Sequence, residues 1–326
     1  MTDIPVIDLA PWFGATPAGR GHVASAVATA CVDVGFFKIA RHRIPAETLS
    51  AAFAVMNDFF DLPASEKAAV RPPDGMAPRG WHALETKNLS RTIGLDTPPD
   101  LREQFYIGPL NPDRARLAAI PEAAPFYQDN VWPARPERLR ETYTALYRAM
   151  ETLGCELMRV FAVALGLDPW FFDGAIDNHF ATLPANFYPV PEGDPRAGQL
   201  RAGAHSDFGS LTILALNDAP GGLQVRMTDE TWRDVSAAPG ELIVNIGDMM
   251  QRWTNERWRS TLHRVVNPPA SDRAGSRRMS IGFFLHPNYD ATIEALPGCA
   301  GPDDPPKNQP IQAGVLMRQK MAARAV

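Results

Sequence analysis

The chain has 326 residues, of which 45% are hydrophobic, and a formal net charge of −5, which together are typical of a globular protein with a large core. The charge gives no reason to expect nucleic acid as a partner, and no apolar run approaches the ~18 residues that a membrane span needs. The first residues lack a secretory signal, and three widely spaced cysteines argue against a disulfide framework, so we expect a reducing, cytoplasmic location.

The first region, residues 1–125, is predicted to be mixed α/β. Alanine- and valine-rich residues predict a helix over His22–Val34, and the following Gly35 is a typical helix end. A short strand is expected over Phe36–Ala40, and a second helix over Thr48–Phe60.

Proline and glycine are frequent in residues 71–99. A long stretch without regular structure inside a compact domain is usually disordered or functional, so this segment is a candidate lid over an active site. Arg79 and Trp81 are its candidate substrate contacts.

The second region, residues 126–326, opens with the longest helical pattern, Pro136–Leu165, whose apolar residues recur at three-to-four spacing. This helix is expected to brace a barrel, because strand signals dominate from Phe180 to Leu285. The loop 268–276 predicts a hairpin between the strands that it joins. The two regions are expected to form one compact unit.

Three residues, His205, Asp207 and His263, can together hold one metal ion. Side chains alternate along a strand, so His205 and Asp207 point to the same face, and a histidine from a neighbouring strand completes two imidazoles and one carboxylate. That set suits non-haem Fe(II) and leaves three coordination positions open, whereas a structural zinc site is closed by four protein ligands. The pattern therefore predicts a catalytic iron site.

Polar residues also recur at a spacing of two in two other predicted strands. Arg278 and Ser280 share one face, as do Asn186 and Tyr188. A guanidinium and a nearby hydroxyl are suited to bind a carboxylate, which an iron site that uses a 2-oxo acid requires. Without the metal-binding residues, the Arg277–Arg278 pair would instead indicate a solvated strand end.

In their order and spacing these motifs resemble the isopenicillin N synthase-like family of Fe(II)- and 2-oxoglutarate-dependent oxygenases. The resemblance spans nearly the whole chain. The matching segments are Ile4–Leu9, Val34–Ile39, Asn186–Pro189, His205–Gly209, Gly221–Val225, Asn245–Asp248, His263–Val265, Arg278–Ser280 and Phe283–Asn288.

The resemblance implies an α+β fold with a double-stranded β-helix (jelly-roll, cupin-like) barrel core, braced by helices and preceded by the mixed α/β region. It implies that His205, Asp207 and His263 are the iron ligands. The expected activity is oxidation of a C–H bond of a small-molecule metabolite, by hydroxylation, desaturation or cyclisation, with release of succinate and CO₂.

The resemblance also assigns the co-substrates, which are 2-oxoglutarate and O₂. Arg278 and Ser280 are expected to bind the distal carboxylate of 2-oxoglutarate, with Tyr188 and Asn186 assisting. The oxidase that names the family keeps the Arg-x-Ser pair but uses no 2-oxo acid, so an oxidase of that type is the alternative function. A non-catalytic barrel that binds a small ligand is a third possibility.

Four further residues are assigned to the surroundings of the iron. Phe208 and Phe284 are candidate substrate contacts, and Asn245 and Asp248 could orient the metal ligands. The sequence specifies neither the substrate nor an oligomeric state.

Overall fold

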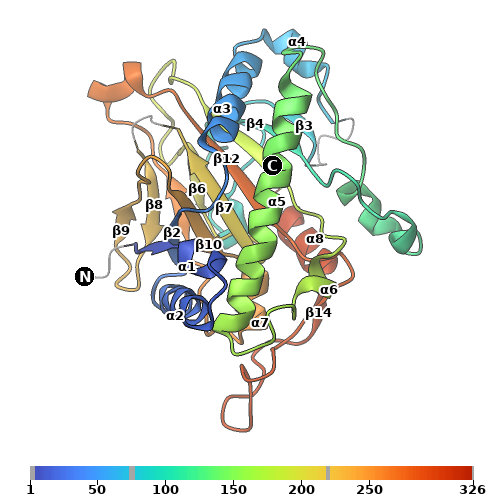
Figure 1. The fold of residues 1–326 in the computed structure, drawn as a ribbon. Coiled ribbons are helices and arrows are strands. Elements are labelled where there is room, and N and C mark those ends of the chain that lie inside the picture. Colours follow the sequence, from blue (N-terminus) through green and yellow to red (C-terminus); the bar gives the residue numbers. More distant parts are fainter. Residues whose placement is uncertain (1–3, 73–77, 218–220, 325–326) are drawn as a thin grey trace.

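The structure is a computed structural model, and it describes residues 4–72, 78–217 and 221–324 (Figure 1). Its strands have the following bounds: β1 Val6–Asp8, β2 Phe36–Ala40, β3 Gly80–His82, β4 Glu103–Ile107, β5 Leu183–Tyr188, β6 Ala202–His205, β7 Leu211–Leu216, β8 Leu223–Arg226, β9 Trp232–Asp234, β10 Leu242–Ile246, β11 His263–Val265, β12 Arg278–Leu285, β13 Thr292–Ile293 and β14 Ile311–Gln312. Within these described ranges they form three sheets, with the orders β1-β2-β10-β7-β12-β5-β4-β3, β6-β11-β8-β9 and β13-β14.

The first two sheets enclose a shared interior. A buried apolar cluster joins residues of the eight-stranded sheet, such as Tyr188 and Ile243, to residues of the four-stranded sheet, such as Val225 and Val265. This is the double-stranded β-helix core with added helices, so the predicted fold class is confirmed. The first region contributes directly to the larger sheet, because β2 pairs with β10 and β4 pairs with β5.

Helices pack around the two large sheets (Figure 1). Their bounds are α1 Ala10–Phe13, α2 Pro17–Asp33, α3 Ala46–Phe60, α4 Ala64–Ala68, α5 Leu139–Ala164, α6 Asp173–Ile176, α7 Asp248–Trp253 and α8 Ala313–Arg324, with 3₁₀ turns η1 Ser90–Ile93, η2 Ala115–Leu117, η3 Pro121–Phe126 and η4 Ala270–Gly275. Figure 1 shows α5 running lengthwise across the front of the sheet. Its apolar stripe is buried with the outward residues of β12, which confirms that this helix braces the barrel.

Two sequence predictions differ from the structure. The strands on either side of residues 268–276 do not form a hairpin, because β11 belongs to the four-stranded sheet and β12 to the eight-stranded sheet. The loop between them carries η4 and crosses from one sheet to the other. The first helix begins at Pro17 instead of His22, since the Thr16 side chain accepts a hydrogen bond from the Gly19 amide and Pro17 occupies the first turn.

The segment 71–99 is more ordered than its composition suggested. It contains β3 and η1, and β3 extends the larger sheet through pairing with β4. Residues 73–77 lie outside the described residues. In the part of the chain that the structure covers, no helix has both the length and the apolar character needed to cross a membrane.

Candidate metal centre

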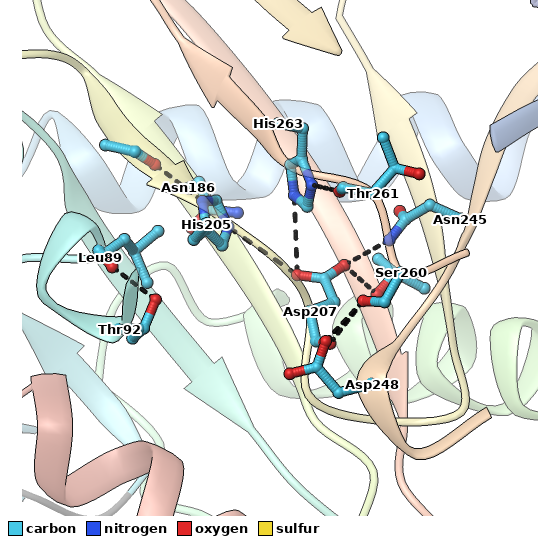
Figure 2. Close-up of polar contacts among 12 residues, drawn as sticks. Leu89, Thr92, Asn186, His205, Asp207, Asn245, Asp248, Ser260, Thr261 and His263 are labelled. Atoms are coloured by element: carbon cyan, nitrogen blue, oxygen red, sulfur yellow. Dashed lines mark hydrogen bonds and ion pairs between the residues drawn. The ribbon is translucent and has the colours of Figure 1, made fainter. Parts of the chain in front are cut away.

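The structure brings His205, Asp207 and His263 together at one end of the barrel. His205 ends β6 and lies opposite His263, which begins β11, while Asp207 follows in the turn after β6. Asp207 Oδ1 lies 3.8 Å from His205 Nε2 and 3.7 Å from His263 Nε2. Figure 2 shows the three side chains pointing toward one another. Their ligand atoms all lie within 4.8 Å of each other, as one shared metal ion requires.

The backbone sets the protonation of both imidazoles. Nδ1 of His205 lies 2.8 Å from the Gly203 carbonyl oxygen, and Nδ1 of His263 lies 3.1 Å from the Thr261 carbonyl oxygen. A carbonyl oxygen only accepts, so each Nδ1 carries a proton, and Nε2 is the nitrogen of each ring that faces Asp207 and is left to bind a metal ion. This is the tautomer that a metal-binding histidine needs.

Two neighbouring strands hold the carboxylate of Asp207. Its Oδ2 accepts hydrogen bonds from Thr212 Oγ1 at 2.5 Å and from Asn245 Nδ2 at 2.7 Å. Thr212 and Asn245 lie opposite each other on β7 and β10, and all three side chains are buried. Oδ1 is thereby directed at the two imidazoles. The sequence singled out Asn245 for this role, but Thr212 was missed because a lone threonine in an apolar strand carries no distinct signal.

The turn that carries Asp207 packs closely against the start of α7. A Cβ added to Gly247 would lie 2.2 Å from the Gly209 carbonyl oxygen, so only glycine allows this approach. The Asp248 amide donates to the Asp207 carbonyl oxygen at 2.7 Å, and the Asp248 carboxylate accepts from Ser260 Oγ at 2.6 Å. Asp248 also forms an ion pair at 2.7 Å with Lys320 of α8. Asp248 therefore fixes the turn instead of binding the metal directly.

The four residues assigned to 2-oxoglutarate form two cross-strand pairs deeper in the barrel. Arg278 lies opposite Tyr188, and Ser280 lies opposite Asn186. All four are buried. The guanidinium of Arg278 lies 5.0 Å from the centre of the Tyr188 ring. Among the described residues, Arg278 Nη1 is buried without a hydrogen-bond partner.

The surroundings of Arg278 favour an anion. Burial lowers the pKa of the Arg278 guanidinium, because a charged group is less stable away from water. Arg201 is a second buried arginine beside the same Tyr188 ring, and burial together with the charge of Arg278 lowers its pKa to about 10. Arg201 donates to the Ser276 carbonyl oxygen at 2.7 Å, which holds it in place without neutralising it. A bound carboxylate would supply the missing counter-charge.

A largely apolar cavity of about 90 Å³ opens beside His205 and Asp207, which both line it. Phe208 and Phe284, the predicted substrate contacts, both line it, as do Asn186 and the side chains of Met317 and Met321 from α8. Arg278 does not line this cavity and instead borders a second one with Leu216 and Val235.

Arg79 and Trp81, which were predicted to contact substrate, do not line the cavity beside the metal-binding candidates. Arg79 is buried behind its wall, where it donates to the Phe126 carbonyl oxygen at 2.7 Å. Trp81 is buried in the main core and donates to Glu103 Oε2 at 2.7 Å. They were assigned to a lid because the segment is rich in proline and glycine, but Trp81 lies on β3 of the larger sheet.

Comparisons with known proteins agree with this geometry. A family described as "non-haem dioxygenase in morphine synthesis N-terminal" matches residues 4–135, and the "2OG-Fe(II) oxygenase superfamily" matches residues 179–287. The validamycin A dioxygenase of Streptomyces hygroscopicus is 33% identical, covering 91% of this chain and 80% of the relative. A 2-oxoglutarate-Fe(II) type oxidoreductase of Emericella nidulans is 32% identical, covering 96% and 88%. The crystal structure of a full-length Neurospora crassa protein in complex with alpha-KG and thymine superposes with a TM-score of 0.84 at 29% identity, covering 98% of this chain and 96% of that one.

Proposed function

Because the chain belongs to the 2OG-Fe(II) oxygenase superfamily, we propose that His205, Asp207 and His263 are the ligands of its ferrous ion. The protein is an Fe(II)- and 2-oxoglutarate-dependent oxygenase that acts on a small molecule with O₂ as co-substrate. The iron supplies the chemistry that couples decarboxylation of 2-oxoglutarate, with release of succinate and CO₂, to oxidation of a substrate C–H bond.

The observation that carries the ligand assignment is the matched set of donor atoms. Both imidazoles hold their proton on the nitrogen that faces a backbone carbonyl, so both Nε2 atoms and Asp207 Oδ1 converge. Thr212 and Asn245 neutralise part of the charge on the other carboxylate oxygen and keep it from turning away. Three protein ligands leave open positions for a co-substrate and an oxidant.

The distal carboxylate of 2-oxoglutarate is assigned to Arg278 and Ser280. This is supported by the buried Arg278 Nη1, for which the described residues provide no acceptor. Tyr188 and Asn186 are the residues directly opposite this pair, so they would flank the co-substrate. The role of these four side chains is to orient it and to exclude water from around the guanidinium.

The substrate is assigned to the cavity lined by Phe208 and Phe284. Relatives act on or bind different small molecules, validamycin A in one and thymine in another. This chemistry can produce hydroxylation, desaturation or cyclisation. Which of these occurs depends on which C–H bond of the substrate the cavity holds nearest the iron.

We assign the two regions, residues 1–125 and 126–326, to one functional unit, which the shared eight-stranded sheet supports. A cytoplasmic location is supported by Cys31, Cys155 and Cys299, which are all free thiols.

The decisive experiment is anaerobic addition of Fe(II) followed by an optical titration with 2-oxoglutarate. We expect a weak visible charge-transfer band that saturates with 2-oxoglutarate. Arg278→Ala should weaken this binding about 30-fold or more, because truncating one partner of a buried charge pair costs about 2 kcal/mol at least. The matched control is Arg277→Ala, which removes a half-exposed arginine paired with Asp61 at 2.7 Å and should leave the titration unchanged.

Two results would contradict the assignment. An unchanged titration in Arg278→Ala would exclude this residue as the carboxylate-binding group. The absence of a band in protein that has bound iron would instead favour the oxidase that takes all its electrons from substrate and needs no 2-oxo acid.

A further inference from the structure

One wall of the substrate cavity is polar, and it comes from a single strand. Arg102, Gln104 and Tyr106 alternate along β4 and the residue before it, and all three line the cavity. Phe105 and Ile107, which alternate with them on the other face of β4, are fully buried in the main core. Outside β4 and the metal-binding turn the wall is mostly apolar, with Thr182, Asn186 and His286 as its other polar residues, so β4 supplies a large share of its hydrogen-bonding capacity.

Arg102 is a fixed and already neutralised cation. Its Nη2 forms an ion pair at 3.2 Å with the buried Asp100, whose other oxygen accepts from the Gly203 amide at 2.9 Å. Burial alone would lower the pKa of Arg102, but Asp100 and the neighbouring Tyr188 outweigh it and raise the pKa above the ordinary arginine value. Among the described residues, Arg102 Nε is buried without a hydrogen-bond partner. The guanidinium therefore keeps donor capacity but needs no further counter-charge.

Gln104 has a defined amide orientation. Asn186 Oδ1 accepts from Arg102 Nη1 at 3.4 Å and from Gln104 Nε2 at 2.6 Å. A guanidinium can only donate, so the Asn186 atom that faces it must be the carbonyl oxygen. Gln104 must then face that oxygen with its NH₂ group, which leaves Gln104 Oε1 as a hydrogen-bond acceptor. Arg102 and Gln104 meet at one atom, so a donor and an acceptor lie next to each other.

We propose that the substrate presents a neutral amide or lactam edge to this wall, with its carbonyl oxygen toward Arg102 and its N–H toward Gln104 Oε1. The inference rests on the proposed function, because Asn186, His205 and Asp207 line the same cavity. The flat apolar remainder of the molecule packs against Phe126, Phe180 and Phe284.

A carboxylate fits this wall less well than a neutral amide. Asp100 already balances the charge of Arg102, so a second anion would lack a counter-ion. A carboxylate is also unable to donate to Gln104 Oε1, and the two acceptors would repel each other. An aliphatic or purely aromatic substrate would offer no hydrogen-bond partner to Arg102 or to Gln104 Oε1 in this buried site.

The test uses protein loaded with Fe(II) and 2-oxoglutarate without oxygen, and calorimetric titration with matched probes. Thymine and 1,3-dimethylthymine differ in their N–H groups, while benzamide and benzoate differ in charge at constant shape. We expect thymine to bind about tenfold more tightly than its dimethyl derivative, because one buried hydrogen bond is lost. Benzamide should likewise bind more tightly than benzoate.

Gln104→Leu removes the acceptor and should abolish the preference for thymine over dimethylthymine. Gln224→Leu, the same exchange on β8 at a residue that does not line the cavity, should keep it. Because loss of Arg102 alone would remove the counter-charge of Asp100, the second test is the double variant Asp100→Asn/Arg102→Gln, which should weaken thymine binding about tenfold. The optical titration with 2-oxoglutarate is the parallel readout. Because Gln104 and Arg102 also hydrogen-bond to Asn186, 2-oxoglutarate should still bind to saturation in these variants, with an affinity that changes less than that for thymine.

Several outcomes would overturn this substrate class while leaving the oxygenase function intact. They are equal binding of thymine and dimethylthymine, a preference for benzoate, or no binding of any probe although the 2-oxoglutarate band forms. A parallel loss of 2-oxoglutarate binding in Gln104→Leu would also overturn it, because the residue would then act through the co-substrate. Absence of the band in the parent protein would instead count against the proposed function itself.

Discussion

The two faces of the eight-stranded sheet differ in what they contribute, although both are buried. On β12, Met279, Ile281, Phe283 and Leu285 face outward and belong to the apolar core beneath α5. The alternating residues include Arg278 and Ser280, which face the barrel interior opposite Tyr188 and Asn186. The same strand thus supplies stability from one face and chemistry from the other.

The difference shows how a buried polar site is tolerated. Charged and polar side chains lose favourable interactions with water when they are buried. Hydrogen bonds within the protein offset only part of that free-energy cost. The inward face compensates through paired groups such as Asp207 with Thr212 and Asn245. The outward face contributes apolar burial at about 25 cal/mol per Å². We therefore expect inward substitutions to reduce binding and turnover, and outward ones to reduce the free energy of unfolding.

The largest effect is expected for Asp207→Ala on the inward side. The variant should bind no iron at the site and show no 2-oxoglutarate-dependent turnover, because only two ligands remain. Metal analysis and succinate release measure this. The control is Asp58→Ala, which removes an exposed carboxylate on α3. Retained turnover in Asp207→Ala would mean that the metal ligands are misassigned.

Phe283→Ala tests the outward face. Phe283 is fully buried, with its ring centre 5.3 Å from that of Tyr147 on α5. Removing a buried phenyl ring typically costs about 3–5 kcal/mol of the free energy of unfolding. Urea unfolding should show this loss, while turnover per folded molecule stays near that of the parent. If Phe283→Ala lost iron binding while its free energy of unfolding stayed the same, the two faces would not have separate roles.

Asn245→Ala should have an intermediate effect on the inward side. It removes one of the two donors to Asp207 Oδ2, and substitutions of such supporting groups typically reduce metal affinity or activity about 10–100-fold. Competition between the protein and a metal chelator measures the affinity. Asn217→Ala, an amide that instead accepts from the Met279 backbone at 3.1 Å, is the control and should leave iron affinity unchanged.

The sequence could predict the two faces because alternation along a strand is a local property. Alternation predicted that Arg278 and Ser280 share one face of a strand, as do Asn186 and Tyr188. In the structure the two strands are neighbours, with Arg278 opposite Tyr188 and Ser280 opposite Asn186. It could not predict which sheet a strand joins, which depends on contacts between distant segments. For that reason the expected hairpin of β11 with β12 was wrong.

Single polar residues in apolar surroundings were also beyond prediction. Thr212 and Gln104 carry no motif, and their roles follow only from what lies across the sheet from them. Arg79 and Trp81 were predicted to contact substrate because their surroundings are rich in proline, which suggested a lid. The chain instead forms the strand β3 there. Lys320 also carries no motif, yet α8 places it against Asp248 beside the metal-binding turn.

The smallest and sharpest comparison uses two adjacent residues of β12, Met279 and Ser280. Ser280→Ala removes one hydroxyl from the proposed carboxylate site, so the KM for 2-oxoglutarate should rise about fivefold, the equivalent of one hydrogen bond of about 1 kcal/mol. Its free energy of unfolding should change little. Met279→Leu conserves volume in the outward core and should cost less than about 1.5 kcal/mol of stability, with the KM unchanged. Both residues are buried and share one strand, so their depth and backbone position are matched. If both variants changed the KM equally, the strand would transmit packing changes to the site, and the two faces would not be functionally separate.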